Sequence, residues 1–224
     1  MKKTLVITGC SSGVGESIAI AFSQLGWNVI GISRDIVKLK ALETRLVNFK
    51  FLQLDISNYS EVEDAFRSIE KIDVLVNNAA IFTTKPFIDC TAIEINSIID
   101  TNLKGTMFCT LEAIKKISDG RIINIGSVSG IHGIQNQAIY SASKFGVAGF
   151  TESIAQECVK RVRFTTISPG GIDTPLWNDK NPYPGDKTRL LKPSNITEAV
   201  KYIINLPENI VLKNMTLFPD NEWH

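Results

Sequence analysis

The chain has 224 residues, enough for one sizeable domain or at most two small ones. Hydrophobic residues make up 44% of it and charged residues 21%, as in ordinary soluble globular proteins. A formal net charge of +1 gives no electrostatic basis for binding nucleic acid or an anionic membrane, and no apolar run is long enough to span a bilayer. The four cysteines are scattered and only two histidines are present, so we expect reduced thiols in a cytoplasmic protein and no metal centre.

A glycine-rich turn follows the first predicted strand, residues 4–8. Gly9, Gly13 and Gly15 lie in the stretch TGCSSGVGES, and apolar residues then recur at the spacing of an amphipathic helix over residues 18–25. A turn of this kind lets a phosphate group approach free backbone N–H groups at the positive end of a helix dipole. The strand before it and the helix after it are the context that a dinucleotide site requires, so the turn predicts phosphate binding.

Predicted strands and helices alternate along the rest of the chain. We expect strands at residues 28–33, 49–54, 72–76, 120–126, 162–168 and within 209–218, and helices around residues 39–46, 62–69, from about 91 to 117, up to about 159 and over 196–203. This alternation predicts an α/β fold, a doubly wound parallel sheet (Rossmann fold) of about seven strands with helices on both faces. No repeat or linker interrupts it, so we expect a single domain over residues 1–224.

Polar residues and glycines follow several of these strands. Right-handed crossovers bring the loops after the strands to one edge of a parallel sheet, and ligands bind at that edge. We therefore expect the glycine turn to gather there with Ser33-Arg34, Asp55, Asn77 and Ser127.

Tyr140 and Lys144 stand four residues apart in the predicted helix that runs to about residue 159, so they share one face of it. A tyrosine titrates near about 10, too high for a general base at neutral pH. A cation close by favours the phenolate and lowers the pKa by roughly 1–3 units. With the Ser127 hydroxyl at the end of a strand, this pair is equipped to move a proton to or from an alcohol or carbonyl oxygen.

These motifs together resemble those of one family. The matching pieces, in chain order, are Thr8-Gly9-x-x-x-Gly13-x-Gly15, Asp55, Asn77-Asn78-Ala79, Asn102, Ser127, Tyr140-x-x-x-Lys144, and Pro169-Gly170 followed by Thr174. Ser127 precedes Tyr140 by thirteen residues, the separation that this family shows. From end to end, the chain resembles the short-chain dehydrogenases/reductases in their compact single-domain form.

The resemblance implies catalytic roles for four residues. Tyr140 would be the acid/base, and Lys144 would lower its pKa and bond the nicotinamide ribose. Ser127 would hold the substrate oxygen. Asn102 would position a water molecule that links Lys144 to solvent. The cofactor would carry the hydride, while the protein supplies geometry and electrostatics.

The resemblance also implies a cofactor site. The glycine turn would wrap the pyrophosphate, Asp55 would face the adenine, and Ile172 and Thr174 would approach the nicotinamide. Capping roles at Asp55 and Thr174 are compatible with this assignment. The full expected set of cofactor-binding residues is Gly9, Ser11, Ser12, Gly13, Val14, Gly15, Ser33, Arg34, Asp55, Ile56, Asn77, Ala79, Tyr140, Lys144, Pro169, Gly170, Ile172 and Thr174.

The residues after the second strand bear on the choice between NADP and NAD. A carboxylate at the end of that strand bonds the ribose hydroxyls of NAD, whereas a basic residue accommodates the extra phosphate of NADP. Ser33 occupies that end, Arg34 follows it, and we expect Asp35 to cap the next helix. We therefore expect NADP(H) to be preferred, with NAD(H) possible.

The substrate is expected to be a small-molecule carbonyl compound or alcohol. The proline-rich segment 173–193 has little periodicity and predicts a substrate loop or lid. His132, Gln135, Trp177 and Tyr183 are candidates for lining the pocket, and surface or packing roles explain them equally well.

Other readings stay open. The chain could be a catalytically silent NAD(P)-binding regulatory module, an NAD-dependent alcohol dehydrogenase or, more weakly, a sugar-nucleotide epimerase. The helical regions 102–117 and 139–159 resemble those with which family members form dimers and tetramers, so a homodimer or homotetramer is expected by analogy.

Overall fold

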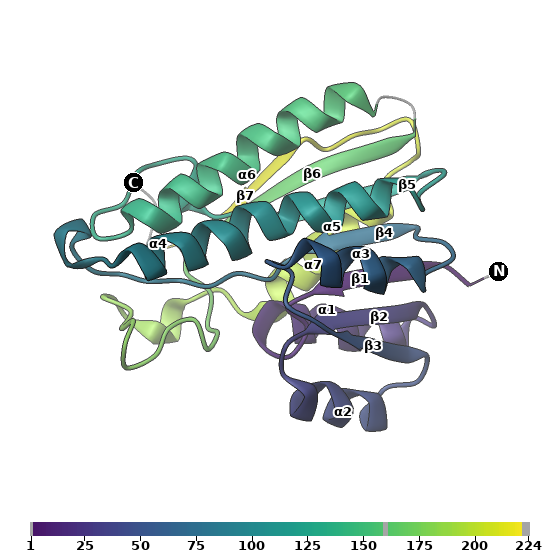
Figure 1. Ribbon diagram of the computed structural model, residues 1–224, viewed down its shortest axis with the longest axis horizontal. Helices are drawn as coiled ribbons and strands as arrows, with labels where there is room; N and C mark the ends of the chain where they lie inside the picture. The colour runs from purple at the N-terminus through teal and green to yellow at the C-terminus, as the bar shows by residue number, and fades with distance from the viewer. Residues whose placement is uncertain (1, 159–160, 221–224) are drawn as a thin grey trace.

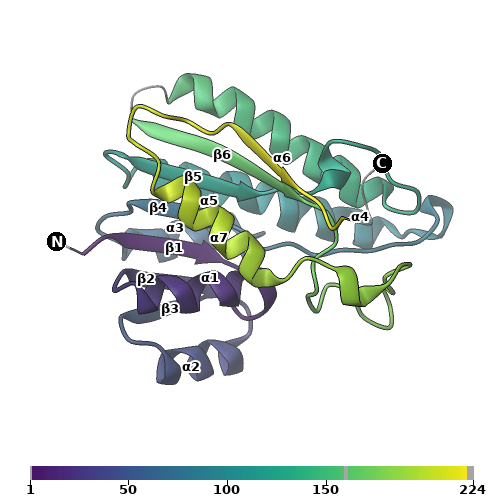
Figure 2. The ribbon, with the colours of Figure 1, turned by 180° about the vertical axis from the view of Figure 1, so that it is seen from behind.

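The protein is built around one parallel sheet. We describe residues 2–158 and 161–220 of a computed structural model, in which seven strands are ordered β3-β2-β1-β4-β5-β6-β7 (Figures 1 and 2). Every pair of neighbouring strands is parallel. The strands are β1 (Thr4–Thr8), β2 (Asn28–Ser33), β3 (Phe49–Gln53), β4 (Val74–Asn77), β5 (Gly120–Ile125), β6 (Val162–Pro169) and β7 (Asn214–Leu217). The predicted doubly wound sheet is confirmed.

Helices cover both faces of this sheet. One face carries α1 (Gly13–Gln24), α2 (Ile36–Arg45) and α7 (Pro193–Ile204), and the other carries α3 (Tyr59–Arg67), α4 (Ala92–Ile99), α5 (Gly105–Ile114) and α6 (Ala138–Glu157) (Figures 1 and 2). Successive strand residues point to opposite faces. Leu5 and Ile7 therefore join the core under α1 and α7, whereas Val6 joins the core under α3 and α5.

The region expected to form one long helix up to about residue 117 is interrupted. A π-helical turn, Asp100–Lys104, joins α4 to α5. Before α4, Thr91 and Glu94 form a capping box that fixes where the helix begins. Helix α6 ends at Glu157, and its expected end at about residue 159 lies outside the described residues.

The last strand, β7, lies within the expected range 209–218 and occupies only its final part. The guanidinium of Arg121 donates hydrogen bonds to the carbonyl oxygens of Leu206, Pro207 and Ile210, and these bonds hold the approach to β7 in a loop. Pairing with β6 begins only at Asn214, opposite Thr166. Within the described part of the chain, no helix is long and apolar enough to cross a membrane.

The direction of winding reverses next to β1, which pairs with β2 on one side and β4 on the other. A crevice forms at such a switch point, beyond the carboxyl ends of the strands. The loops after β1, β4 and β5 meet at this place.

Candidate active site

A cavity of about 920 Å³ lies at the carboxyl ends of these strands. It takes its walls from the glycine turn after β1, the loops after β2, β3, β4 and β5, helix α6, and the segment after β6. Most of the residues expected at the site line it, namely Gly9, Ser11, Ser12, Gly13, Val14, Ser33, Arg34, Asp55, Ile56, Ala79, Ser127, Tyr140, Lys144, Pro169, Gly170, Ile172 and Thr174.

The turn after β1 is held tightly against the loop after β4. Gly9 has a φ of +69°, and a Cβ added to it would lie 2.7 Å from the Cα of Ala79. The Thr8 hydroxyl accepts hydrogen bonds from the backbone N–H groups of Asn78 (3.0 Å) and Ala79 (3.1 Å). A side chain at Gly9 would therefore meet both a conformational and a steric obstacle.

The turn leaves a backbone cradle at the start of α1. The first helical residues follow Ser12, whose side chain makes no capping hydrogen bond, so that bond does not occupy the first N–H groups of α1. Free N–H groups and the positive end of a helix dipole suit an anionic group such as a pyrophosphate.

Gly15 and Asn77 were expected to touch the cofactor but do not line the cavity. A Cβ on Gly15 would lie 2.3 Å from the carbonyl oxygen of Gly9, so Gly15 lets α1 pack against the turn. The buried Asn77 amide donates to Thr110 Oγ1 (3.0 Å) and to Asn124 Oδ1 (2.8 Å). The lining residue is Asn78, because β4 extends through Asn77 and turns that side chain into the core.

Ser33, Arg34 and Asp55 lie together at one end of the cavity. Arg34 Nη1 is 3.3 Å from Asp55 Oδ2, and Ser33 Oγ donates to Ser11 Oγ (2.9 Å). Partial burial of Asp55 raises its pKa, but hydrogen bonds from Ser57 and the charge of Arg34 outweigh this and leave the pKa below its usual value. Asp35 accepts a hydrogen bond from the backbone N–H of Lys38 and caps α2, as the sequence predicted.

Tyr140 lies near the start of α6 and is buried beside Ser127. Burial raises the pKa of Tyr140 to about 12, against the opposing effect of its hydrogen bond with Ser127. Ser127 is held in place because its Oγ also accepts a hydrogen bond from the backbone N–H of Ser129 (3.1 Å). The phenol and the hydroxyl therefore form one fixed pair facing the cavity.

Lys144 lies one helical turn beyond Tyr140. Its Nζ donates to the carbonyl oxygen of Ile125 (2.8 Å) and lies 5.6 Å from the centre of the Tyr140 ring. Burial lowers the pKa of Lys144 to about 8. The expected lowering of the Tyr140 pKa by this amine is not found, because burial disfavours the charged form of both groups and its effect on Tyr140 is the largest.

Asn102 does not line the cavity and lies in the π-helical turn. Its Oδ1 accepts from the Ile81 backbone N–H (2.8 Å), while its Nδ2 donates to the Ile81 carbonyl oxygen (2.9 Å) and to Ser143 Oγ (3.1 Å). These bonds secure the loop after β4 to the helices that carry the site.

The far end of the cavity holds residues that the motifs did not identify. Phe82, from the loop after β4, joins His132, Trp177 and Tyr183, whereas Gln135 does not line the cavity. Gln137, which was not among the candidates, does line the cavity, and its Oε1 accepts a hydrogen bond from Ser129 Oγ (2.8 Å). Phe82 lies in an irregular loop, so no periodic pattern could have identified it.

Comparisons with known proteins agree with this geometry. A family model described as short chain dehydrogenase matches residues 3–184. An uncharacterized oxidoreductase of Staphylococcus epidermidis is 31% identical over 227 residues, and one of Staphylococcus aureus (strain USA300) is 32% identical; each alignment covers 97% of both chains.

Solved structures agree as well. The crystal structure of serine dehydrogenase from Escherichia coli is 28% identical, with a TM-score of 0.88, and the match covers 99% of this chain and 100% of that one. The closed form of serine dehydrogenase complexed with NADP+ is also 28% identical, with a TM-score of 0.91 and coverage of 99% and 96%. This chain therefore belongs to the short chain dehydrogenase family and is an oxidoreductase that acts on CH–OH groups.

Proposed function

We propose that this protein is an NADP(H)-dependent oxidoreductase that interconverts a carbonyl and an alcohol on a small molecule, with Tyr140 as the acid/base. The observation that carries the proposal is the Tyr140 phenol, hydrogen-bonded to Ser127 and placed at the cavity one helical turn from Lys144. The glycine turn forms another wall of the same cavity. A group bound at the turn and a substrate bound at Ser127 would therefore share one space.

The side chains divide the proton chemistry between them. A bound nicotinamide would supply a hydride to the carbonyl carbon, or take one from an alcohol carbon. In reduction, Tyr140 donates its proton to the carbonyl oxygen while the Ser127 hydroxyl holds that oxygen. The raised pKa keeps Tyr140 protonated at neutral pH, which suits this direction. Lys144 would bond the ribose and return the proton, and Asn102 would support a relay to solvent.

The cavity fits a dinucleotide. The cradle at the start of α1 suits the pyrophosphate, and the Asp55 carboxylate and Arg34 guanidinium lie at the end expected for the adenosine. Arg34 is mostly exposed and could turn from Asp55 to a ribose phosphate. The structural relative complexed with NADP+ supports the same preference. The choice of NADP(H) over NAD(H) rests on Arg34.

The cofactor preference is tested by exchanging the charge at this position. In the double variant Ser33→Asp/Arg34→Ser, the ratio of kcat/KM for NADPH to kcat/KM for NADH should fall by about tenfold or more, so that NADH becomes the preferred cofactor. The reason is that the new carboxylate would repel the extra phosphate of NADPH. Arg67→Ser is the matched control, since Arg67 forms surface ion pairs on α3. A native enzyme that prefers NADH would refute the preference and leave the oxidoreductase activity standing.

Serine, the compound in the name of the structural relatives, carries an ammonium and a carboxylate. Beyond Tyr140, the described lining residues include no carboxylate that could pair with such an ammonium. A homodimer or homotetramer and a cytoplasmic location stay predictions from the sequence.

A further inference from the structure

Aromatic rings line the cavity beyond Tyr140. The Phe82 ring centre is 4.8 Å from that of Tyr140 and 5.0 Å from that of Trp177, and the Trp177 centre is 5.0 Å from that of Tyr183. The planes of each pair are steeply inclined, the edge-to-face arrangement that aromatic rings favour. Phe82, Trp177 and Tyr183, here called the aromatic row, are half-buried and line the cavity. The row therefore offers a ready-made apolar surface beside the acid/base.

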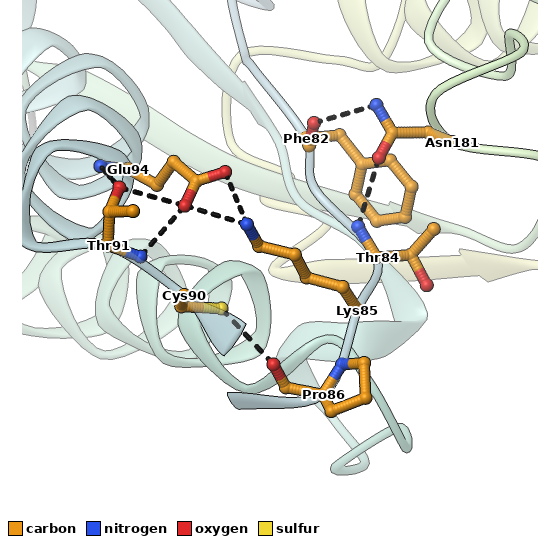
Figure 3. Close-up of polar contacts among 8 residues, drawn as sticks. All are labelled: Phe82, Thr84, Lys85, Pro86, Cys90, Thr91, Glu94 and Asn181. Atoms are coloured by element: carbon orange, nitrogen blue, oxygen red, sulfur yellow. Dashed lines mark hydrogen bonds and ion pairs between the residues drawn. The ribbon is translucent and has the colours of Figure 1, made fainter. Parts of the chain in front are cut away.

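A hydrogen-bonded clamp made by Asn181 joins the two loops that carry the row (Figure 3). Trp177 and Tyr183 belong to the segment after β6, whereas Phe82 follows β4. Asn181 joins the two loops: its Oδ1 accepts from the Thr84 backbone N–H (3.0 Å), and its Nδ2 donates to the Phe82 carbonyl oxygen (3.2 Å). Both polar ends of this amide are thus used to hold the segment that carries Trp177 and Tyr183 against the loop that carries Phe82.

The loop beneath the clamp is itself anchored. Lys85 Nζ donates to both carboxylate oxygens of Glu94 (2.7 and 2.8 Å), and Glu94 is part of the capping box of α4 (Figure 3). The Lys85 backbone N–H donates to the carbonyl oxygen of Asn136 (2.8 Å). The row is therefore held from the segment after β6, from α4 and from the loop before α6.

Charge is scarce at this end of the cavity. Among the described lining residues, those of formal charge are Arg34 and Asp55, which pair with each other, and Lys144, which is bonded to a backbone carbonyl. None of the basic residues of the segment 173–193 lines the cavity: Arg189 pairs with Asp220 (2.6 Å), Lys192 pairs with Asp173 (3.0 Å), and Lys180 and Lys187 are exposed. An ionic group on the substrate would lose its water here without gaining an opposite charge, a costly exchange.

We propose that the substrate is an uncharged ketone or aldehyde, or the matching alcohol, whose aromatic or other flat apolar group lies against the aromatic row. This inference names the substrate class of the site and rests on the proposed function. Asn181 acts as a positioning residue, because it bonds the backbone of Phe82 and so joins that loop to the segment that carries Trp177 and Tyr183.

Four ketones separate the effect of the ring from that of the charge. Ethyl benzoylformate has a ring and no charge, benzoylformate has a ring and a carboxylate, and ethyl pyruvate and pyruvate are their counterparts without the ring. Calorimetric titration into the full chain saturated with NADP+ measures binding, and NADPH oxidation measures turnover separately. We expect the affinity for ethyl benzoylformate to be higher, by about tenfold or more, than the affinity for benzoylformate and than that for ethyl pyruvate.

Variants assign this preference to the row. Trp177→Ala should lower the ratio of affinities for ethyl benzoylformate and ethyl pyruvate by about tenfold, and Trp177→Phe should keep most of it. Asn181→Ala removes both hydrogen bonds between the loops and should lower the ratio by about three- to tenfold, with little change in Tm. Tyr202→Ala removes an aromatic side chain that is 57% exposed on α7, and should leave the ratio unchanged.

Each outcome decides the inference. If benzoylformate binds as tightly as its ester, the uncharged class is overturned, and His132, which also lines the cavity, becomes the group to examine for a carboxylate. If ethyl pyruvate equals the ring-bearing ester, or if none of the four binds, the aromatic row is not the recognition surface. If ethyl benzoylformate binds selectively without NADPH oxidation, the inference stands and the proposed activity fails.

Discussion

The two ends of the cavity are built from different material. The end near Gly9 consists of strand ends, glycines and backbone N–H groups, fixed by short contacts to the loop after β4. The end near Trp177 consists of side chains on two irregular loops that Asn181 joins. Few substitutions are tolerated in a backbone cradle, because almost any side chain that replaces a glycine would occupy the space that the bound group needs. A wall of side chains can be changed one residue at a time without disturbing the sheet.

This difference suggests how one fold serves many substrates. The end that we assign to the cofactor depends on the main-chain path, which the whole sheet determines. The end that we assign to the substrate depends on a few rings at loop positions. Changes at the two ends should therefore have separable effects on cofactor binding and on substrate binding.

The strongest test removes the hydroxyl between the two ends. Tyr140→Phe should lower kcat by about 10²- to 10⁴-fold, the usual worth of a positioned acid/base, because no other described group takes its place beside Ser127. The dissociation constants of NADPH and of ethyl benzoylformate should change little. Tyr59→Phe is the control, since the Tyr59 hydroxyl donates to Glu112 away from the cavity. Near-normal turnover by Tyr140→Phe would exclude it as the acid/base.

A second test uses the buried charge at the cofactor end. The pKa of Lys144 is lowered to about 8 from 10.5, so between these pH values the unfolded chain binds a proton that the folded chain does not. The free energy of unfolding should gain at most about 3 kcal/mol from this group as the pH rises through that window. Below about pH 8 both states are protonated and the burial penalty is present in full. Other buried groups oppose this at higher pH: the Cys10 and Cys109 thiols, whose pKa values are raised from 9.0 to about 12, from about pH 9, and Tyr140, whose pKa is raised from 10.0 to about 12, from about pH 10.

Urea unfolding of wild type and Lys144→Met between pH 7.5 and 10 measures this contribution. The unfolding free energy of wild type minus that of Lys144→Met should increase with pH, because the opposing groups are the same in both proteins. Lys40→Met, at an exposed position on α2, should follow the wild-type profile. Identical pH profiles for wild type and Lys144→Met would show that the amine is solvated in the folded state.

The smallest expected effect comes from comparing two glycine variants, which separates the cost of a positive φ from the cost of a Cβ that lies too close to a neighbouring atom. Gly9→Ala should lower stability by about 2 kcal/mol and weaken NADPH binding, because its φ is +69° and its Cβ would meet Ala79. Gly26→Ala shares the positive φ (+81°) but meets nothing within 4 Å, so it should lower stability by about 1 kcal/mol and leave NADPH binding intact. Thermal melts and NADPH titrations of both variants give the comparison. Equal effects on NADPH binding would mean that the cradle is not the phosphate site.

Local patterns predicted most of the residues that line the cavity near the glycine turn, and missed Phe82 and Asn181 at its other end. The glycine turn, the Asp35 cap and the Tyr140–Lys144 spacing are short-range features, readable within one or two turns of chain. Asn181 meets the backbone of Phe82, 99 residues away, and no periodicity encodes a contact between two irregular loops. The misplacement of Asn77 has another cause: β4 runs to that residue, and one step along a strand exchanges the two faces.

The π-helical turn at Asp100–Lys104 has a consequence for insertions and deletions in this part of the chain. Each residue of a helix turns the chain by about 100°, so deleting one residue from this turn would rotate the whole of α4 relative to α5. Asn102 would then swing away from Ile81, and Glu94 would carry Lys85 out of position. One missing residue would thus misalign both walls of the pocket together, whereas single replacements in the same turn would leave the register untouched.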